Sequence, residues 1–166
     1  HEGKYFQFPS STSIPKPLQP NGPPIWVAAR DPNSFEFAIA NDWHVQVTPL
    51  WKGLEEIERL KNIFNETLLK FPNKPKPLSM VLNHCYIGGN DEDIQKGSVA
   101  VSKFYNNFGA WFKNDRAVVQ GTLDPLTQEE LDSNTMCSPQ EMLKNQNIGT
   151  LQDVIDNIKQ YEDLGF

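Results

Sequence analysis

The sequence predicts an α/β fold in which parallel strands alternate with helices. Short apolar runs bounded by proline, glycine or small residues alternate with longer segments whose apolar residues recur every three or four positions. Such an order requires parallel strands joined by right-handed crossovers. A doubly wound open sheet and a (β/α)8 barrel both use it. Three predicted strands, ending one helix short of a fourth, suit half of a barrel better than a complete open sheet.

The composition is that of a single globular domain of ordinary size. A chain of 166 residues, 38% of them apolar and 22% charged, can bury a substantial core. The net charge of −6 argues against nucleic acid or an anionic membrane as a partner, because both require clustered Lys and Arg. No apolar run approaches the roughly 20 residues of a membrane span. Cys85 and Cys137 are too few for a disulfide framework or a zinc site, so we expect no metal and a cytoplasmic setting.

Residues 1–24 are predicted to be a connector rather than part of a domain. The segment is rich in Ser and Pro, so it cannot be helical and is expected to lie extended over a surface. It begins at His1, with neither a methionine nor a signal-like segment. We therefore expect the chain to be a piece of something longer.

A strand at 25–29 and a helix at about 32–42 form the segment around which the rest is organised. The apolar run of the strand ends at the small residue Ala29. Asp31 is the expected N-cap, and Pro32 occupies the first helical position, where its missing N–H costs nothing.

This strand-to-helix turn could hold an anion. Free N–H groups and the helix dipole both point at it, and Ser34 adds a hydroxyl in the first turn. No glycine-rich phosphate loop is present, however. On spacing alone, an ordinary turn with a solvated Arg30 is the better interpretation.

The repeats of strand and helix continue to residue 108. A short strand at 45–48 precedes a helix at 53–71, whose apolar residues fall on one stripe. A third strand at 79–87 precedes a helix that starts at 91. We expect this helix to direct five apolar or aromatic residues toward a core: Ile94, Val101, Phe104, Tyr105 and Phe108.

Residues 109–147 are an excursion from this alternation. They are polar and broken by glycine and proline, with short helices expected near 127–132 and 139–145. An excursion of this length is more often functional or mobile than inert. Residues 148–166 then form a final helix, capped by Thr150.

Four stretches, in their order and separations, resemble the bacterial luciferase-like flavin-dependent monooxygenases. They are Gly3-Lys4-Tyr5-Phe6, Pro15-Lys16-Pro17-Leu18-Gln19-Pro20, Pro23-Pro24-Ile25-Trp26-Val27-Ala28-Ala29, and Ile148-Gly149-Thr150 with Asp153-Val154-Ile155. Members of this family are TIM barrels of roughly twice this length. The resemblance covers most of the chain and implies the C-terminal half of a (β/α)8 TIM barrel, from before the fifth strand to the helix preceding the eighth. The first four strands and the eighth are absent.

The resemblance implies an enzyme that uses reduced FMN, supplied by a separate flavin reductase, and O2 to oxygenate a small organic substrate. We expect the isolated fragment to be inactive, and to associate as a homo-oligomer or with a complementing N-terminal half. Three alternatives stay open. They are an oxidoreductase of the same fold that uses the deazaflavin F420, a non-catalytic relative that binds flavin or a partner chain, and an unrelated open-sheet domain.

The resemblance also implies a cofactor site at the turn after the strand at 25–29. The residues that would hold the FMN phosphate are Ala29, Arg30, Asp31 and Ser34. The N–H groups at 30 and 31 and the Ser34 hydroxyl would be the donors. With the local chemistry, this favours a phosphate site over an ordinary turn.

Trp51 and His84 are the candidate walls of a flavin or substrate pocket. Trp51 follows the strand at 45–48, at the rim of the barrel where active sites of this fold lie. An aromatic residue packed under a loop is an equally good interpretation. A lone histidine on a strand, such as His84, is more often a packing residue than an acid or base. The catalytic residues are unknown, since the best-known catalytic histidine of the family would fall outside this chain.

Overall fold

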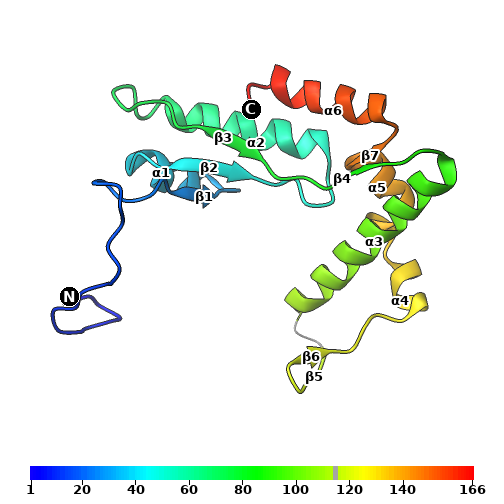
Figure 1. The fold of residues 1–166 in the computed structure, drawn as a ribbon, viewed down its shortest axis with the longest axis horizontal. Helices are drawn as coiled ribbons and strands as arrows, with labels where there is room; N and C mark the ends of the chain where they lie inside the picture. Colours follow the sequence, from blue (N-terminus) through cyan, green and yellow to red (C-terminus); the bar gives the residue numbers. More distant parts are fainter. Residues whose placement is uncertain (114–115) are drawn as a thin grey trace.

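The computed structural model describes residues 1–113 and 116–166, in which helices alternate with short strands (Figure 1). In chain order the elements are β1 (Trp26–Ala28), α1 (Pro32–Ala40), β2 (His44–Val47), α2 (Leu54–Leu68), β3 (Ser79–Val81), β4 (Cys85–Ile87), α3 (Asp91–Lys113), β5 (Val118–Val119), β6 (Thr122–Leu123), α4 (Gln128–Ser133), the 3-10 helix η1 (Thr135–Cys137), α5 (Pro139–Asn145), β7 (Asn147–Gly149) and α6 (Leu151–Asp163).

The strands confirm the predicted parallel α/β pattern. β1, β2 and β3 form one parallel sheet in that order, and β4 pairs in parallel with β7. A short antiparallel hairpin of β5 and β6 lies within the predicted excursion. The strands do not close into a barrel within the described residues, and the family's TIM barrel stays the expected architecture of a longer protein.

The prediction of one strand at 79–87 is wrong, because the chain changes partners near Asn83. The N–H of Leu82 still donates to Val47 of β2, whereas the carbonyl of His84 accepts from Asn147 of β7. Between them, the Asn83 side chain accepts from the N–H of His84 and donates to the hydroxyl of Tyr161. A side chain that bonds its neighbouring backbone in this way competes with a regular ladder.

A strand that the sequence did not predict, β7, precedes the final helix. The three residues of β7 are all buried, and β7 pairs with β4. Only one of them, Ile148, is a large apolar residue, so no periodic signal marks the strand. The count of three strands is therefore wrong, although the parallel alternation holds.

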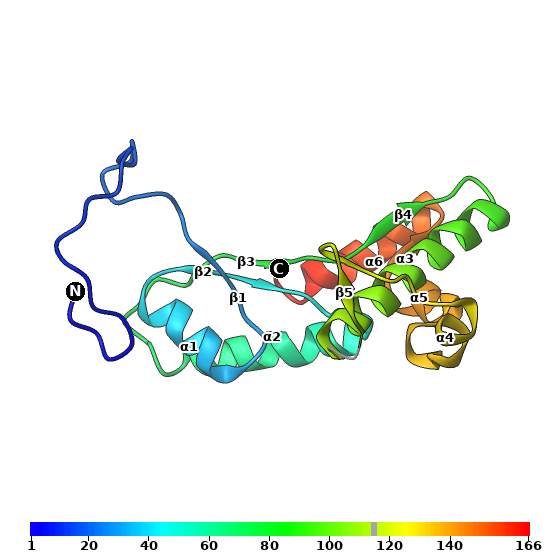
Figure 2. The same cartoon turned by 90° about the horizontal axis from the view of Figure 1, so that it is seen from below.

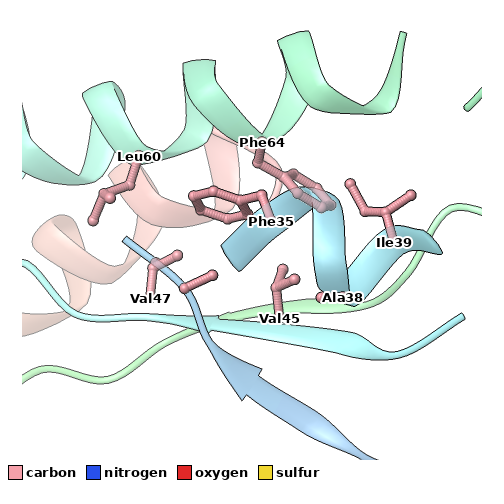
Figure 3. Close-up of a cluster of buried hydrophobic side chains, with 8 residues drawn as sticks. Phe35, Ala38, Ile39, Val45, Val47, Leu60 and Phe64 are labelled. Atoms are coloured by element: carbon pink, nitrogen blue, oxygen red, sulfur yellow. The ribbon is translucent and has the colours of Figure 1, made fainter. Parts of the chain in front are cut away.

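The main core lies between the sheet and the helices α1 and α2 (Figure 3). Both helices cover the same sheet face, onto which β2 projects Val45 and Val47. The other fully buried members are Ala29, Phe35, Ala38, Ile39, Leu60 and Phe64. A second core joins α3, η1, α5 and β7 around Tyr105, Cys137, Met142 and Ile148.

The opposite face of the three-stranded sheet is open. Side chains alternate along a strand, so residues next to the buried valines point away from the helices. Ala28, Gln46 and Met80 lie in register on this face, and the rings of Trp26 and His44 are in tilted contact with centroids 4.8 Å apart. Trp26 and Met80 are each 38% exposed. The apolar residues here have no cover within the described chain.

Residues 1–24 extend away from the sheet (Figures 1 and 2). Nearly all of their side chains are exposed, and a single antiparallel bridge joins Glu2 to Gln7. At the other end, Thr150 and Asp153 form a capping box at the start of α6, as the sequence suggests for Thr150. None of the helices described combines the length and apolar character needed to cross a membrane.

Candidate functional site

The turn between β1 and α1 is organised by the Asp31 carboxylate. Asp31 is the N-cap of α1, as predicted, and accepts from the N–H groups of Asn33 at 3.0 Å and Ser34 at 3.1 Å. The Ser34 hydroxyl donates to the same carboxylate at 2.6 Å. These bonds, that of the Ser34 hydroxyl above all, lower the pKa of Asp31 and keep it ionised. The turn thus carries a negative charge where an anion would bind.

Arg30 is not simply solvated, because its partly exposed side chain pairs with a buried carboxylate. Its Nη2 donates to Glu56 of α2 at 2.7 Å, and Glu56 also accepts from Nε and Nη2 of Arg59. Glu56 is only 5% exposed. The hydrogen bonds from Arg59 and, to a smaller extent, from Arg30 lower the pKa of Glu56 to about 2, although burial alone would raise it. The ammonium group of Lys52, 3.8 Å from the carboxylate, acts in the same direction.

The other nitrogen of the Arg30 guanidinium, Nη1, is buried and meets no acceptor among the described residues. A buried donor without a partner is costly, so this nitrogen is a candidate to bond an oxygen atom of water or of a ligand. Ser34 supplies a hydroxyl in the first turn of α1. This donor set fits a phosphate, whereas the Asp31 carboxylate opposes one. The assignment of Ala29, Arg30, Asp31 and Ser34 to a cofactor site stays a prediction.

A cavity of about 310 Å³ lies at the carboxyl ends of β2 and β3. Thr48 comes directly after β2 and Leu82 directly after β3, while α3 closes one side. In barrel enzymes this end of the strands carries the active site. The lining residues are Thr48, Leu50, Leu82, Asn83, His84, Phe104, Tyr105 and Phe108.

His84 lies in this cavity, against two rings of α3. Its ring centroid is 4.8 Å from that of Phe104 and 5.1 Å from that of Tyr105, both edge to face. Burial lowers the pKa of His84 from 6.5, so the imidazole is neutral near pH 7. Burial also raises the pKa of Tyr105 to about 12. The cavity therefore holds two titratable groups, both uncharged.

Trp51 also lies against Tyr105 but lines a different cavity. The two ring centroids are 6.1 Å apart, at an interplanar angle of 74°. The cavity beside Trp51 has a volume of about 780 Å³ and is lined largely by charged side chains of α2 and α5, Glu56 and Arg59 among them. The structure thus brings both Trp51 and His84 against Tyr105 but does not place them in one cavity.

The rim that carries Trp51 is held by side chains just before β7. Asn145 Nδ2 donates to the carbonyl of Trp51 at 3.0 Å, and Gln146 Nε2 donates to that of Leu50 at 2.7 Å. Leu50 has a φ of 57°, which non-glycine residues seldom adopt. Two bonds from residues almost 100 positions away hold this uncommon turn in place.

The sequence did not single out the aromatic residues of α3 as site residues. Phe104, Tyr105 and Phe108 were expected in a core, but of the three only Tyr105 is buried, and Phe104 is 46% exposed. The available signal was the concentration of aromatic residues over 104–112, more than one buried stripe needs. No His, Cys, Asp or Glu cluster suited to a metal ion occurs within 1–113 and 116–166.

The comparisons with known proteins cover the whole chain. The model of a family described as luciferase-like monooxygenase matches residues 1–166. The chain is 49% identical, over all 166 residues, to the flavin-dependent trigonelline monooxygenase, oxygenase component, of Acinetobacter baylyi, of which it covers 46%. It is 24% identical over 164 residues to the uncharacterized protein y4vJ of Sinorhizobium fredii, covering 99% of this chain and 46% of that protein. The chain thus spans about half the length of these curated relatives.

Proposed function

Because this chain belongs to the luciferase-like monooxygenase family, we propose that it forms part of the oxygenase component of a flavin-dependent monooxygenase. The observation that carries the proposal is the 49% identity, over the whole of this chain, to an oxygenase component named for its action on trigonelline. The proposed substrate is trigonelline or a closely related pyridinium compound. A separate flavin reductase is the proposed partner, since the relative is named as one component of its system.

Reduced FMN is the proposed cofactor, and when bound it supplies the activation of O2. We assign its phosphate to the turn before α1. Two observations support this assignment. The Ser34 hydroxyl lies in the first turn of α1, and the buried Nη1 of Arg30, which precedes that helix by two residues, meets no acceptor among the described residues. For the phosphate to bond Ser34, Asp31 would have to release the Ser34 hydroxyl. Otherwise the backbone N–H groups at 30 and 31 would bind the phosphate instead.

The apolar cavity between β2, β3 and α3 supplies what the chemistry needs from the protein. Leu50, Leu82 and Phe104 give it apolar walls, and an apolar site that excludes water once substrate and flavin fill it would protect reactive oxygen species from wasteful breakdown. The neutral His84 adds a polar atom without adding a charge. The name of the relative favours a flavin over the deazaflavin F420.

The test is oxygenation by the intact protein that carries these 166 residues. It is supplied with FMN, a flavin reductase, NADH and trigonelline under ¹⁸O₂, and the product is analysed by mass spectrometry. We expect one ¹⁸O atom in the product and none when FMN is omitted. Flavin binding without product would support the non-catalytic alternative, and activity only with reduced F420 would overturn the choice of flavin.

A further inference from the structure

The cavity at the carboxyl ends of β2 and β3 contains no charged side chain. Its titratable members, His84 and Tyr105, are kept neutral by burial. The remaining lining groups are aliphatic, aromatic, hydroxyl or amide. A cationic ligand in this cavity would therefore have no carboxylate to pair with.

Aromatic rings line the cavity where a carboxylate would otherwise pair with a cation. His84, Phe104 and Tyr105 form three edge-to-face pairs, with centroid separations of 4.8, 5.1 and 5.3 Å. Phe108 stacks on Phe104 at 5.9 Å. Because neighbouring rings are inclined to one another by 63° to 84°, their faces point in different directions and do not all cover one another. Ring faces carry the negative part of the quadrupole and attract cations, quaternary ammonium groups above all.

The polar atoms in the cavity are few. The amide nitrogen of Asn83 is engaged by Tyr161, and the hydroxyl oxygen of Thr48 accepts from the N–H of Leu50. The hydroxyl protons of Thr48 and Tyr105 and the His84 ring remain to meet a ligand carboxylate. A volume of about 310 Å³ suits a single small aromatic ring with its substituents.

We propose that this cavity binds the substrate as an N-methylpyridinium cation held against the ring faces of α3, with Phe104 as a residue that determines specificity. The inference rests on the proposed function, because the pyridinium class comes from the relative that acts on trigonelline. Trigonelline is an N-methylpyridinium carboxylate, whereas nicotinate has the same ring and carboxylate without the methyl group and positive charge. The cavity is expected to prefer the former.

The test measures binding of trigonelline and of nicotinate to the intact protein by isothermal titration calorimetry at pH 7.5. Phe104→Leu removes a ring face but keeps an apolar side chain, and we expect it to weaken trigonelline binding about fivefold to thirtyfold, as for a partly desolvated cation–π contact. Nicotinate binding should change less than twofold. Phe104→Tyr, which keeps the ring, should bind trigonelline within about twofold of the wild type. Phe37→Leu, at an exposed ring of α1, is the matched control and should have no effect.

If Phe104→Leu weakened the binding of trigonelline and of nicotinate equally, Phe104 would contribute apolar packing alone and the inference would be overturned. Unchanged binding of trigonelline would overturn it too. Loss of FMN affinity with trigonelline binding intact would assign the cavity to the flavin instead. Failure of the proposed function has a separate signature. A wild-type protein that selects trigonelline over nicotinate but oxygenates nothing would support this inference and contradict the proposed function. Oxygenation of a different substrate, without trigonelline binding, would support an oxygenase function and contradict this inference.

Discussion

The hydroxyl of Ser34 donates to the carboxylate of Asp31 at 2.6 Å, within the turn proposed to hold the flavin phosphate. One donor of the proposed site is thus engaged by an anion that the chain itself supplies. A phosphate that binds there must compete with Asp31 for Ser34. The two side chains therefore have opposite expected effects on flavin affinity.

Ser34→Ala is expected to weaken FMN binding by the intact protein. Loss of a hydrogen bond to a charged group costs roughly 1.5–3 kcal/mol. Part of this cost is offset, because the wild-type Ser34 must first give up its hydrogen bond to Asp31. Titration of flavin fluorescence measures the change. An affinity within about twofold of the wild type would remove Ser34 from the site. Ser10→Ala, in the exposed N-terminal segment, is the matched control.

Asp31→Asn is expected to strengthen FMN binding by about twofold to fivefold, as befits removal of an exposed like charge. Asparagine caps helices about as well as aspartate, so α1 should keep its start. The same fluorescence titration, repeated at 0.5 M NaCl, should show a smaller difference because salt screens exposed charges. Weaker binding in Asp31→Asn would mean that the carboxylate positions the donors rather than opposing the phosphate.

Local features of the fold were predictable from the sequence because short-range rules decide them. The cap of α1 by Asp31 and the apolar stripe of α2 both follow from residues within a few positions. The break near Asn83 was not predictable, since it depends on Tyr161, 78 positions away. The same holds for β7, whose partner strand lies about 60 residues earlier.

The candidate site divides in the same way. The sequence could place Arg30 at the end of a strand, but not its pairing with Glu56 on the next helix. It could pick His84, but not the aromatic residues of α3 that surround it, because a helical stripe of aromatic residues predicts a core. Which face of α3 meets the cavity is set by tertiary packing.

Glu56→Gln is expected to destabilise the protein near pH 7 by up to about 3 kcal/mol, since it leaves Arg30 and Arg59 without their shared carboxylate. The pKa of Glu56 is about 2 in the folded protein, below its usual 4.5, so its stabilising effect is complete above pH 4.5 and is lost as the pH falls toward 2. Urea unfolding at pH 7, 4 and 2.5 should therefore show a shrinking difference from the wild type. Glu58→Gln, an exposed neighbour on α2, should differ little at any pH. A difference independent of pH would exclude the ion pairs as its cause.

Hydrogen exchange should divide the predicted excursion at 109–147 into two parts. The hairpin of β5 and β6 is exposed and α4 buries no residue, whereas α5 buries Met142 in the second core. We expect fast exchange over 118–133 and slow exchange over 139–147. If the first part covers the substrate, as its composition suggests, trigonelline should slow it. Uniformly slow exchange with no effect of ligand would identify an ordinary packed extension.

The open sheet face predicts how these 166 residues behave when produced alone. Trp26, Met80 and Leu82 expose apolar surface there, and within the described chain β1 pairs only with β2. Unpaired edges and apolar faces promote association. We therefore expect the isolated chain to self-associate or to remain loosely packed, and not to oxygenate trigonelline when given reduced FMN.

Sedimentation velocity and the oxygenation assay test this expectation. Met80→Gln, on the open face, should reduce self-association, whereas Leu69→Gln, at a more exposed apolar residue beyond the end of α2, should not. Comparing the two variants distinguishes association through the sheet face from association caused by any exposed apolar residue. A well-packed monomer that turns over substrate would contradict the half-barrel interpretation, because the open face would then need no further chain to cover it.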